Sequence, residues 1–86
     1  MSAEQGDIVS LVESIVISLV DDPTKVQISS MEDAETETLT IEVRVDADDV
    51  GKVIGRQGRI IKAIRTLARA ASSYVGGSRI EVEVVD

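Results

Sequence analysis

The sequence predicts an α+β fold with the element order helix, strand, strand, helix, helix, strand. Three observations predict this order. Apolar residues recur at helical spacing near the start, they alternate with polar residues in later segments, and two glycines three positions apart separate two further helical patterns. A chain of 86 residues fits one small domain, expected over 1–86 with a core of about 7–85.

The first element is expected to be a helix that begins after an Asp7 N-cap and ends before Pro23. Proline stops a helix because its ring fixes φ and removes a backbone donor. The predicted buried stripe of this helix consists of Ile8, Leu11, Val12, Ile15, Leu19 and Val20.

Two strands joined by a hairpin are expected next. Val26 and Ile28 mark a short first strand, and the acidic run 31–37 is predicted to be the hairpin loop. The second strand has the clearest pattern, because its apolar residues alternate strictly with Thr40, Glu42 and Arg44. Its apolar residues are Leu39, Ile41, Val43 and Val45. This alternation is typical of a sheet with one covered face and one face in water.

A short helix and a break are expected after the second strand. Asp46 as an N-cap, with Asp49 in the first turn, predicts a helix from Val50 to about 54. Gly55 and Gly58 then interrupt the helical pattern.

A longer helix is expected from about Gly58 to the glycine pair 76–77, and a last strand from Ile80 to Val84. The residues of this helix predicted to face inward are Ile61, Ile64, Leu67, Ala68 and Ala71. Those predicted to face solvent are Arg59, Lys62, Arg65 and Arg69.

Charge is distributed very unevenly along the chain. The formal net charge is -7, yet the segment 50–80 holds seven of the nine Lys and Arg residues and no Asp or Glu. All 16 acidic residues lie elsewhere, with two basic ones, so the remainder carries -14. We therefore expect one cationic face, suited to a polyanion, on a body that repels polyanions.

Composition argues against catalysis and metal binding. The chain has no Cys and no His, which removes thiolate ligands, the commonest metal ligand and the commonest proton shuttle. The glycine pattern of 51–58 matches neither the P-loop nor the dinucleotide-binding motif. Acidic pairs such as Asp48 and Asp49 fall at predicted helix ends, where capping and solvation explain them. We expect a non-enzymatic protein with no cofactor and no metal.

Hydropathy gives no sign of a membrane segment. No stretch of about 18 apolar residues is present. The residues 1–7 lack the basic start of a signal peptide. We therefore expect no membrane insertion and a cytoplasmic location.

The most informative segment is the glycine-flanked turn 55–58, with Arg56 and Gln57 between its two glycines. Glycines let the backbone turn sharply and let another backbone approach closely. The N-terminus of the helix that follows presents amide donors and a positive dipole end, which suit a phosphate. Arg56, Arg59 and Lys62 would add contacts to neighbouring phosphates. The plainer alternative is an ordinary connection between two helices, in which glycine serves as a C-cap.

Residues 49–66 read DVGKVIGRQGRIIKAIRT, and with this stretch the chain resembles a KH domain of type II. It is most similar to the small stand-alone bacterial KhpA (YlqC) family, over nearly its whole length. The resemblance implies a three-stranded mixed sheet with three helices packed on one face. It also implies that a GXXG loop holds about four nucleotides of single-stranded RNA backbone.

The resemblance also implies site residues and partners. The predicted RNA-binding residues are Lys52, Val53, Ile54, Gly55, Arg56, Gln57, Gly58, Arg59, Lys62 and Arg65. The groove wall is expected to comprise Val53, Ile54, Ile61 and the strand beginning at Leu39. The family further implies a homodimer, a larger KH partner of the KhpB (Jag) type, RNA chaperone activity, post-transcriptional regulation, and a link to cell shape and cell-wall biogenesis.

Two alternatives remain open. Arg65 and Arg69 either contact RNA or form a solvated face that pairs with the acidic remainder of the chain. The protein could also be an interaction adaptor whose helices mainly form a homodimer or heterodimer surface. Ile60, expected to be exposed beside the loop and off the inward stripe, is the candidate dimer residue.

Overall fold

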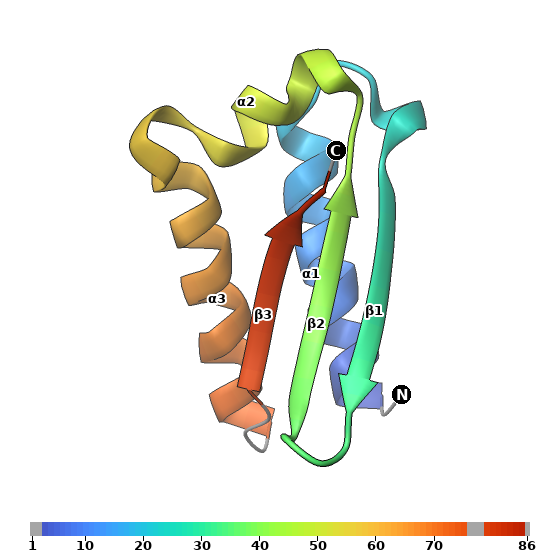
Figure 1. The fold of residues 1–86 in the computed structure, drawn as a ribbon, viewed down its shortest axis with the longest axis vertical. Helices are drawn as coiled ribbons and strands as arrows, with labels where there is room; N and C mark the ends of the chain where they lie inside the picture. Colours follow the sequence, from blue (N-terminus) through green and yellow to red (C-terminus); the bar gives the residue numbers. More distant parts are fainter. Residues whose placement is uncertain (1–2, 76–78, 86) are drawn as a thin grey trace.

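The computed structural model describes residues 3–75 and 79–85, which form three α-helices and three strands (Figure 1). The elements are α1 (Ala3–Leu19), β1 (Gln27–Asp33), β2 (Thr38–Arg44), α2 (Val50–Ile54), α3 (Arg59–Val75) and β3 (Arg79–Val84). Short 3-10 turns occupy Pro23–Lys25, Ala47–Asp49 and Arg56–Gly58. The predicted α+β element order is confirmed, while the glycine pair 76–77 lies outside the described residues.

The strands form one mixed sheet in the order β1-β2-β3. β1 pairs antiparallel with β2, with Ile28 opposite Val43, and β2 pairs parallel with β3, with Leu39 opposite Ile80. The crossover between the parallel strands is made by α2 and α3. In Figure 1, α1 lies behind the sheet, α3 runs beside β3, and α2 lies beyond the end of β3. The expected mixed sheet covered by helices is confirmed.

The core lies between the sheet and the helices. In β2, Leu39, Ile41 and Val43 are buried, and the polar residues between them are only partly covered. The other core residues are Ile8, Val12, Val16, Val53, Ile61, Ile64, Ala68, Ile80 and Val82. The alternation in the sequence therefore identified the covered and open faces of the sheet correctly.

The first helix differs from its prediction in its start and in its buried stripe. It begins at Ala3, so Asp7 lies inside α1 and is not its N-cap. Leu11, predicted to be buried, is 38% exposed, whereas Val16, outside the predicted stripe, is 0% exposed. The buried line follows Ile8, Val12 and Val16 at four-residue spacing, which leaves Leu11 on the flank of the helix.

The predicted hairpin loop 31–37 is also wrong in its first part. β1 continues through Asp33, which pairs with Thr38, and only the remaining residues form the turn. The Asp33 carboxylate accepts a hydrogen bond from the Glu35 amide at 3.0 Å, which starts the turn there. The hydrogen bond of the Asp33 side chain therefore determines where the turn begins, and the polarity of the whole segment does not.

The inward face of α3 holds one further difference. Ile64 and Ala68 are buried as expected, but Leu67 is 52% exposed. The covered residues Ile61, Ile64 and Ala68 form a narrower stripe than the sequence indicated, because α3 lies at the side of the sheet. Leu67 consequently faces solvent.

Candidate nucleic-acid interface

The helical path breaks at Gly55, where α2 ends. Gly55 has φ 78° and ψ 171°, and its amide donates to the Gly51 carbonyl at 2.8 Å. A Cβ at Gly55 would lie 2.6 Å from Cγ1 of Ile60. Both the backbone conformation and the close approach of Ile60 therefore require glycine here.

The turn that follows uses two more residues with positive φ. Gln57 has φ 58° and Gly58 has φ 73°, and the Gly58 amide donates to the Gly55 carbonyl at 3.1 Å. A Cβ at Gly58 would meet only ordinary van der Waals contacts, so the demand for glycine at 58 comes from the backbone alone. The chain makes a compact bend between α2 and α3, and a continuous helix does not run through these positions.

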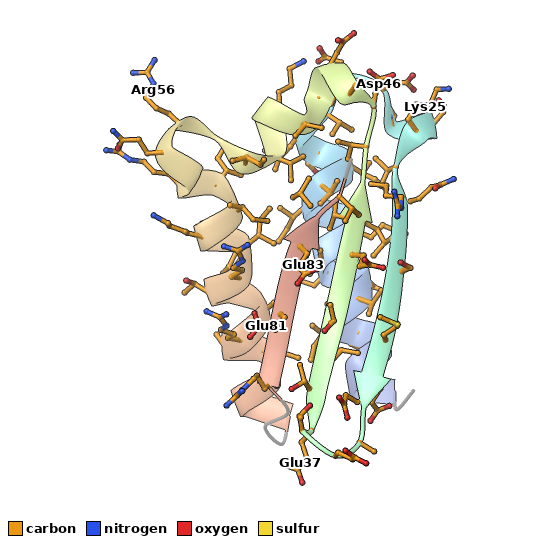
Figure 2. All side chains as sticks on the ribbon, in the orientation of Figure 1. Lys25, Glu37, Asp46, Arg56, Glu81 and Glu83 are labelled. Atoms are coloured by element: carbon orange, nitrogen blue, oxygen red, sulfur yellow. The ribbon has the colours of Figure 1, made fainter. Side chains whose placement is uncertain are left out.

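The tip of this bend is open to solvent and cationic. Arg56 and Gln57 are exposed, and Figure 2 shows Arg56 pointing away from the body of the molecule. Arg59 and Lys62, on the first turns of α3, are exposed as well. The Arg59 guanidinium donates to the Gln57 side-chain oxygen at 3.4 Å, so it lies over the loop. Among the described residues, Arg56 and Lys62 form no ion pair.

The loop also faces the N-terminus of α3, a helix of 17 residues. The aligned peptide dipoles of a helix of this length place partial positive charge at that end. No acidic side chain occurs in its first turn. The three cations Arg56, Arg59 and Lys62 and the helix end therefore act in the same direction, toward an anion at the loop.

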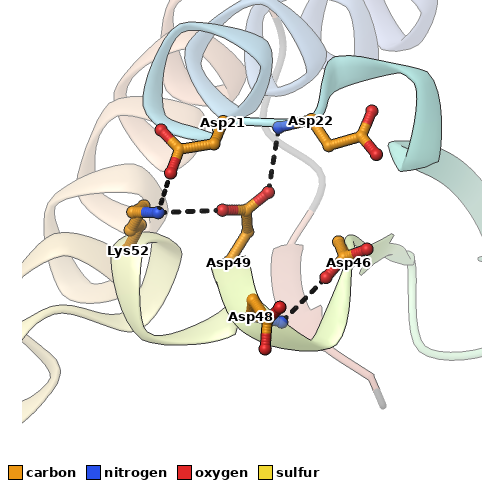
Figure 3. Close-up of polar contacts among 6 residues, drawn as sticks. All are labelled: Asp21, Asp22, Asp46, Asp48, Asp49 and Lys52. Carbon is orange, nitrogen blue, oxygen red and sulfur yellow. Dashed lines mark hydrogen bonds and ion pairs between the residues drawn. The ribbon is translucent and has the colours of Figure 1, made fainter.

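Lys52, expected to contact RNA, is held by two carboxylates. Its Nζ forms ion pairs with Asp21 and with Asp49, the latter at 3.0 Å (Figure 3). Hydrogen bonds to Asp21 and Asp49, in that order of importance, raise the pKa of Lys52. The structure thus places this ammonium among carboxylates, in contrast to the unpaired cations of the loop.

Asp49 is a buried carboxylate, so the explanation by capping and solvation expected from the sequence is wrong for this residue. It is 2% exposed, accepts from the Asp22 amide at 3.1 Å and binds Lys52 (Figure 3). Burial opposes the charged form, but the hydrogen bonds from Asp22 and Lys52 outweigh it and lower the pKa of Asp49. Asp22 is 27 positions away in the chain, so no local pattern could reveal its contact with Asp49. Asp46 does cap its turn as predicted, by accepting from the Asp48 amide at 2.9 Å.

Arg65 and Arg69 connect α3 to the outer edge of β3. Nε of Arg65 donates to the Val82 carbonyl at 3.0 Å, and Nε of Arg69 donates to the Ile80 carbonyl at 3.2 Å. Arg69 also pairs with Glu81 at 3.6 Å. The Arg69–Glu81 pair agrees with the alternative of a solvated face paired with acidic residues. The hydrogen bonds to the β3 carbonyls were part of neither role considered from the sequence.

Three parts of the expected groove wall lie elsewhere in the structure than predicted. Val53 is 0% exposed and Ile61 is 6% exposed, so both lie in the core beneath the loop. The strand beside α3 is β3, whereas Leu39 is buried in β2 at the centre of the sheet. Ile54 remains half-buried at the surface next to Gly55.

Ile60 differs from its prediction as well. It was expected to be exposed, but it is half-buried and its side chain packs over Gly55. The side chain therefore supports the bend from inside the molecule. Leu67, two turns further along the same side of α3, is an exposed large apolar residue in the described part of this helix.

Other kinds of site have little support in the described residues. Across 3–75 and 79–85, no group of three or more His, Cys, Asp or Glu side chains could hold a metal ion. The same residues contain no helix long and apolar enough to cross a bilayer.

The αββααβ order, the mixed sheet and the glycine-flanked bend between α2 and α3 define a KH-type domain. The family model described as the KH domain of KhpA/KhpB matches residues 9–84. The chain belongs to this KhpA/KhpB KH-domain family.

Curated relatives agree with this assignment. An RNA-binding protein KhpA of Borreliella burgdorferi is 43% identical over 83 residues, which cover 96% of this chain and 98% of the relative. An RNA-binding protein KhpA of Clostridium acetobutylicum is 45% identical over 75 residues, covering 87% and 96%. These relatives are named for RNA binding and not for a reaction, in agreement with the prediction of a non-enzymatic protein.

A solved structure shares the fold. It is that of Era in complex with MgGDPNP and nucleotides 1506–1542 of 16S ribosomal RNA, with a TM-score of 0.58 and 25% sequence identity. The match covers 91% of this chain and 30% of that chain. The present fold therefore corresponds to one part of a larger protein whose structure contains RNA.

Proposed function

We propose that the protein binds single-stranded RNA through the bend 55–58, as a small non-enzymatic module. The observation that carries the proposal is the exposed, cationic bend at the N-terminus of α3, in a chain that is otherwise acidic. The names of the KhpA relatives and the RNA in the Era complex support it.

The geometry suggests how each residue contributes. A sugar-phosphate strand would pass along the open side of the bend at Gly58, because Ile60 fills the inner side of the bend at Gly55. Arg56, Arg59 and Lys62 would contact successive phosphates. Ile54, half-buried beside the loop, would offer an apolar surface to an unstacked base. Lys52 and Arg65 would act mainly by positioning α2 and α3, because both already have partners.

A double substitution tests the proposal directly. Replacing Arg56 and Gln57 with Asp puts two carboxylates where the phosphates would dock, and we expect short single-stranded RNA to lose at least about tenfold in affinity. Fluorescence anisotropy with labelled RNA gives the affinity, and circular dichroism shows whether the variant is folded. The matched control is Lys25→Asp with Gln27→Asp, which makes the same change in charge at exposed positions outside the bend. A folded loop variant that binds RNA as well as the parent would refute the mechanism.

The wider role follows from family membership. We infer a homodimer, or a heterodimer with a larger KhpB (Jag) type protein, that acts in the cytoplasm as an RNA chaperone and post-transcriptional regulator linked to cell shape and cell-wall biogenesis. The alternative, an adaptor in which RNA is incidental, is favoured by exposed Leu67 on α3.

A substitution at Leu67 distinguishes an RNA-binding protein from an interaction adaptor. Ile60→Asp would disturb the packing on Gly55, so its effects on RNA binding and on association could not be distinguished. Leu67→Asp changes an exposed side chain on α3. Sedimentation velocity should show loss of the dimer with RNA binding retained if α3 provides a separate interface. An unchanged dimer would exclude Leu67 from that interface.

A further inference from the structure

One contact between α3 and β3 is made twice. Nε of Arg65 donates to the Val82 carbonyl at 3.0 Å, and Nε of Arg69 donates to the Ile80 carbonyl at 3.2 Å. The helix and the strand run in opposite directions (Figure 1). Four residues of a helix advance by about 6 Å and two residues of a strand by about 6.6 Å, so the two elements stay in register. Each arginine is thereby placed beside the residue that follows its carbonyl in β3.

That following residue is a glutamate in both cases, but only one of the two pairs is closed. Glu81 forms an ion pair with Arg69 at 3.6 Å. Glu83 is exposed, and among the described residues neither it nor Arg65 forms an ion pair. Arg65 and Glu83 are therefore a guanidinium and a carboxylate on adjacent elements, with room between them for a ligand.

This open pair lies on the side of the closed pair that faces the bend. Arg65 follows Lys62 by three residues on α3, so the two side chains share one face of the helix. In Figure 2, Glu83 lies nearer than Glu81 to the end of β3 beyond which α2 lies. An RNA strand that is held at the bend and continues along α3 would reach Arg65 and Glu83 next.

The chemistry of the open pair suits a neutral base better than a phosphate. The hydrogen bond to Val82 occupies only Nε of Arg65 and fixes the guanidinium, whose two terminal nitrogens have no partner among the described residues. The planar group presents those nitrogens as two parallel donors. Val82 is 1% exposed, so its backbone offers nothing to a ligand. The Glu83 carboxylate would repel a phosphate but can accept two hydrogen bonds from a base.

Guanine is the base whose edges match two donors beside two acceptors. A guanidinium donates to its adjacent acceptors N7 and O6. A carboxylate accepts from its N1–H and its N2 amino group, which lie on the adjoining Watson–Crick edge. Cytosine lacks one of these groups, and in adenine and uracil donors and acceptors alternate. Guanine therefore makes the most hydrogen bonds with this pair of side chains.

We propose that Arg65 and Glu83 together recognise one guanine of the bound RNA. The inference rests on the proposed RNA binding at the bend, and it adds a base preference to contacts that otherwise involve phosphates. Arg65 contacts N7 and O6, and Glu83 contacts N1–H and the N2 amino group. Arg69 and Glu81 are paired with each other and take no part.

Uridine octamers with one central guanosine or one central adenosine are the probes. Fluorescence anisotropy should show about tenfold tighter binding of the guanosine octamer, the discrimination of one good bidentate contact. Equal affinities would overturn the recognition of guanine and leave RNA binding at the bend intact. If neither octamer binds, the proposed function fails, and the present inference fails with it.

A matched pair of substitutions identifies the carboxylate. Glu83→Gln and Glu81→Gln each remove one negative charge from the same strand. Glu83→Gln should remove most of the preference for guanosine over adenosine, whereas Glu81→Gln should keep it. Circular dichroism shows that both variants are folded. A preference that survives Glu83→Gln, or that Glu81→Gln reduces equally, would overturn the proposal.

Inosine tests the contact at the level of one group, because it is guanosine without the N2 amino group. An octamer with central inosine should bind the parent several-fold more weakly than the guanosine octamer. The Glu83→Gln variant should bind these two octamers equally. If the parent does not distinguish inosine from guanosine, Glu83 does not contact the amino group and the proposal is wrong.

Discussion

At the scale of single residues, Gly55 is the position on which the bend depends most. Its positive φ and the closeness of Ile60 are independent demands, whereas Gly58 has only the first. The two glycines of the motif look alike in the sequence, and the structure makes them unequal.

Alanine substitution should reveal this difference. Gly58→Ala should lower the free energy of unfolding by about 1–2 kcal/mol, the cost of the left-handed conformation. Gly55→Ala should cost clearly more, because its Cβ would meet Ile60. Urea denaturation measures both values. In an Ile60→Ala background the excess at Gly55 should shrink, and an unchanged excess would show that Ile60 is not its cause.

Asp49 links pH to stability. Its pKa in the folded protein is lowered from 3.8, so the unfolded chain takes up a proton first as the pH falls. The stabilisation is therefore complete well above 3.8 and is lost as the pH falls through the lower, folded value.

Asp49→Asn should make the protein less stable at neutral pH and flatten the loss of stability on the acid side. Urea denaturation at a series of pH values measures this. Asp48→Asn is the control, because Asp48 is exposed and one position away. If the two variants show the same acid dependence, the buried carboxylate is not its source.

At the scale of elements, the basic residues of α3 divide into two groups. Arg59 and Lys62 are exposed near the bend, whereas Arg65 and Arg69 hold the helix against β3. A stripe of cations that is uniform in the sequence therefore has one end open to solvent and one end that contacts β3.

Methionine substitution should separate these two ends. Arg65→Met keeps the apolar stem and removes the hydrogen bond to Val82, so stability should fall by about 1 kcal/mol. Lys62→Met should leave the stability of the protein nearly unchanged and should lower its affinity for RNA. Thermal unfolding and RNA titration on both variants give the comparison. The assignment fails if Arg65→Met matches the parent in stability while Lys62→Met does not.

At the scale of the whole molecule, the cationic bend and the acidic hairpin lie at different ends. The bend and the first turns of α3 carry Arg56, Arg59 and Lys62, whereas the hairpin and the sheet carry Glu37, Glu81 and Glu83 (Figure 2). Between these regions, Arg69 pairs with Glu81. Contact with a polyanion is thereby restricted to one region. The number of free cations there is small, because Lys52 and Arg65 are engaged.

This count predicts the salt dependence of RNA binding. With three phosphate contacts, from Arg56, Arg59 and Lys62, log affinity should fall against log salt with a slope of about −2. Lys62→Met should reduce the slope by about 0.7, the share of one contact on a single strand. Titrations over a range of salt concentrations measure it. A slope that Lys62→Met leaves unchanged would remove Lys62 from the interface.

The element order, the covered face of β2, the Asp46 cap and the break at 55–58 could all be read from the sequence. Each depends on residues close together in the chain, whose spacing fixes backbone geometry or amphipathicity. The family resemblance rested on the same local stretch, and the family match over residues 9–84 confirms it.

Only the tertiary structure decided which residues of these patterns meet. The burial of Asp49, the ion pairs of Lys52, the contacts of Arg65 and Arg69 with β3, and the exposure of Leu11 and Leu67 all depend on how helices lie against the sheet. Apart from the Lys52–Asp49 pair, the polar contacts named here join residues 11 or more positions apart in the chain. Local spacing gives the face of a helix but not its angle to a neighbour, and that angle determines which cations of this protein remain free.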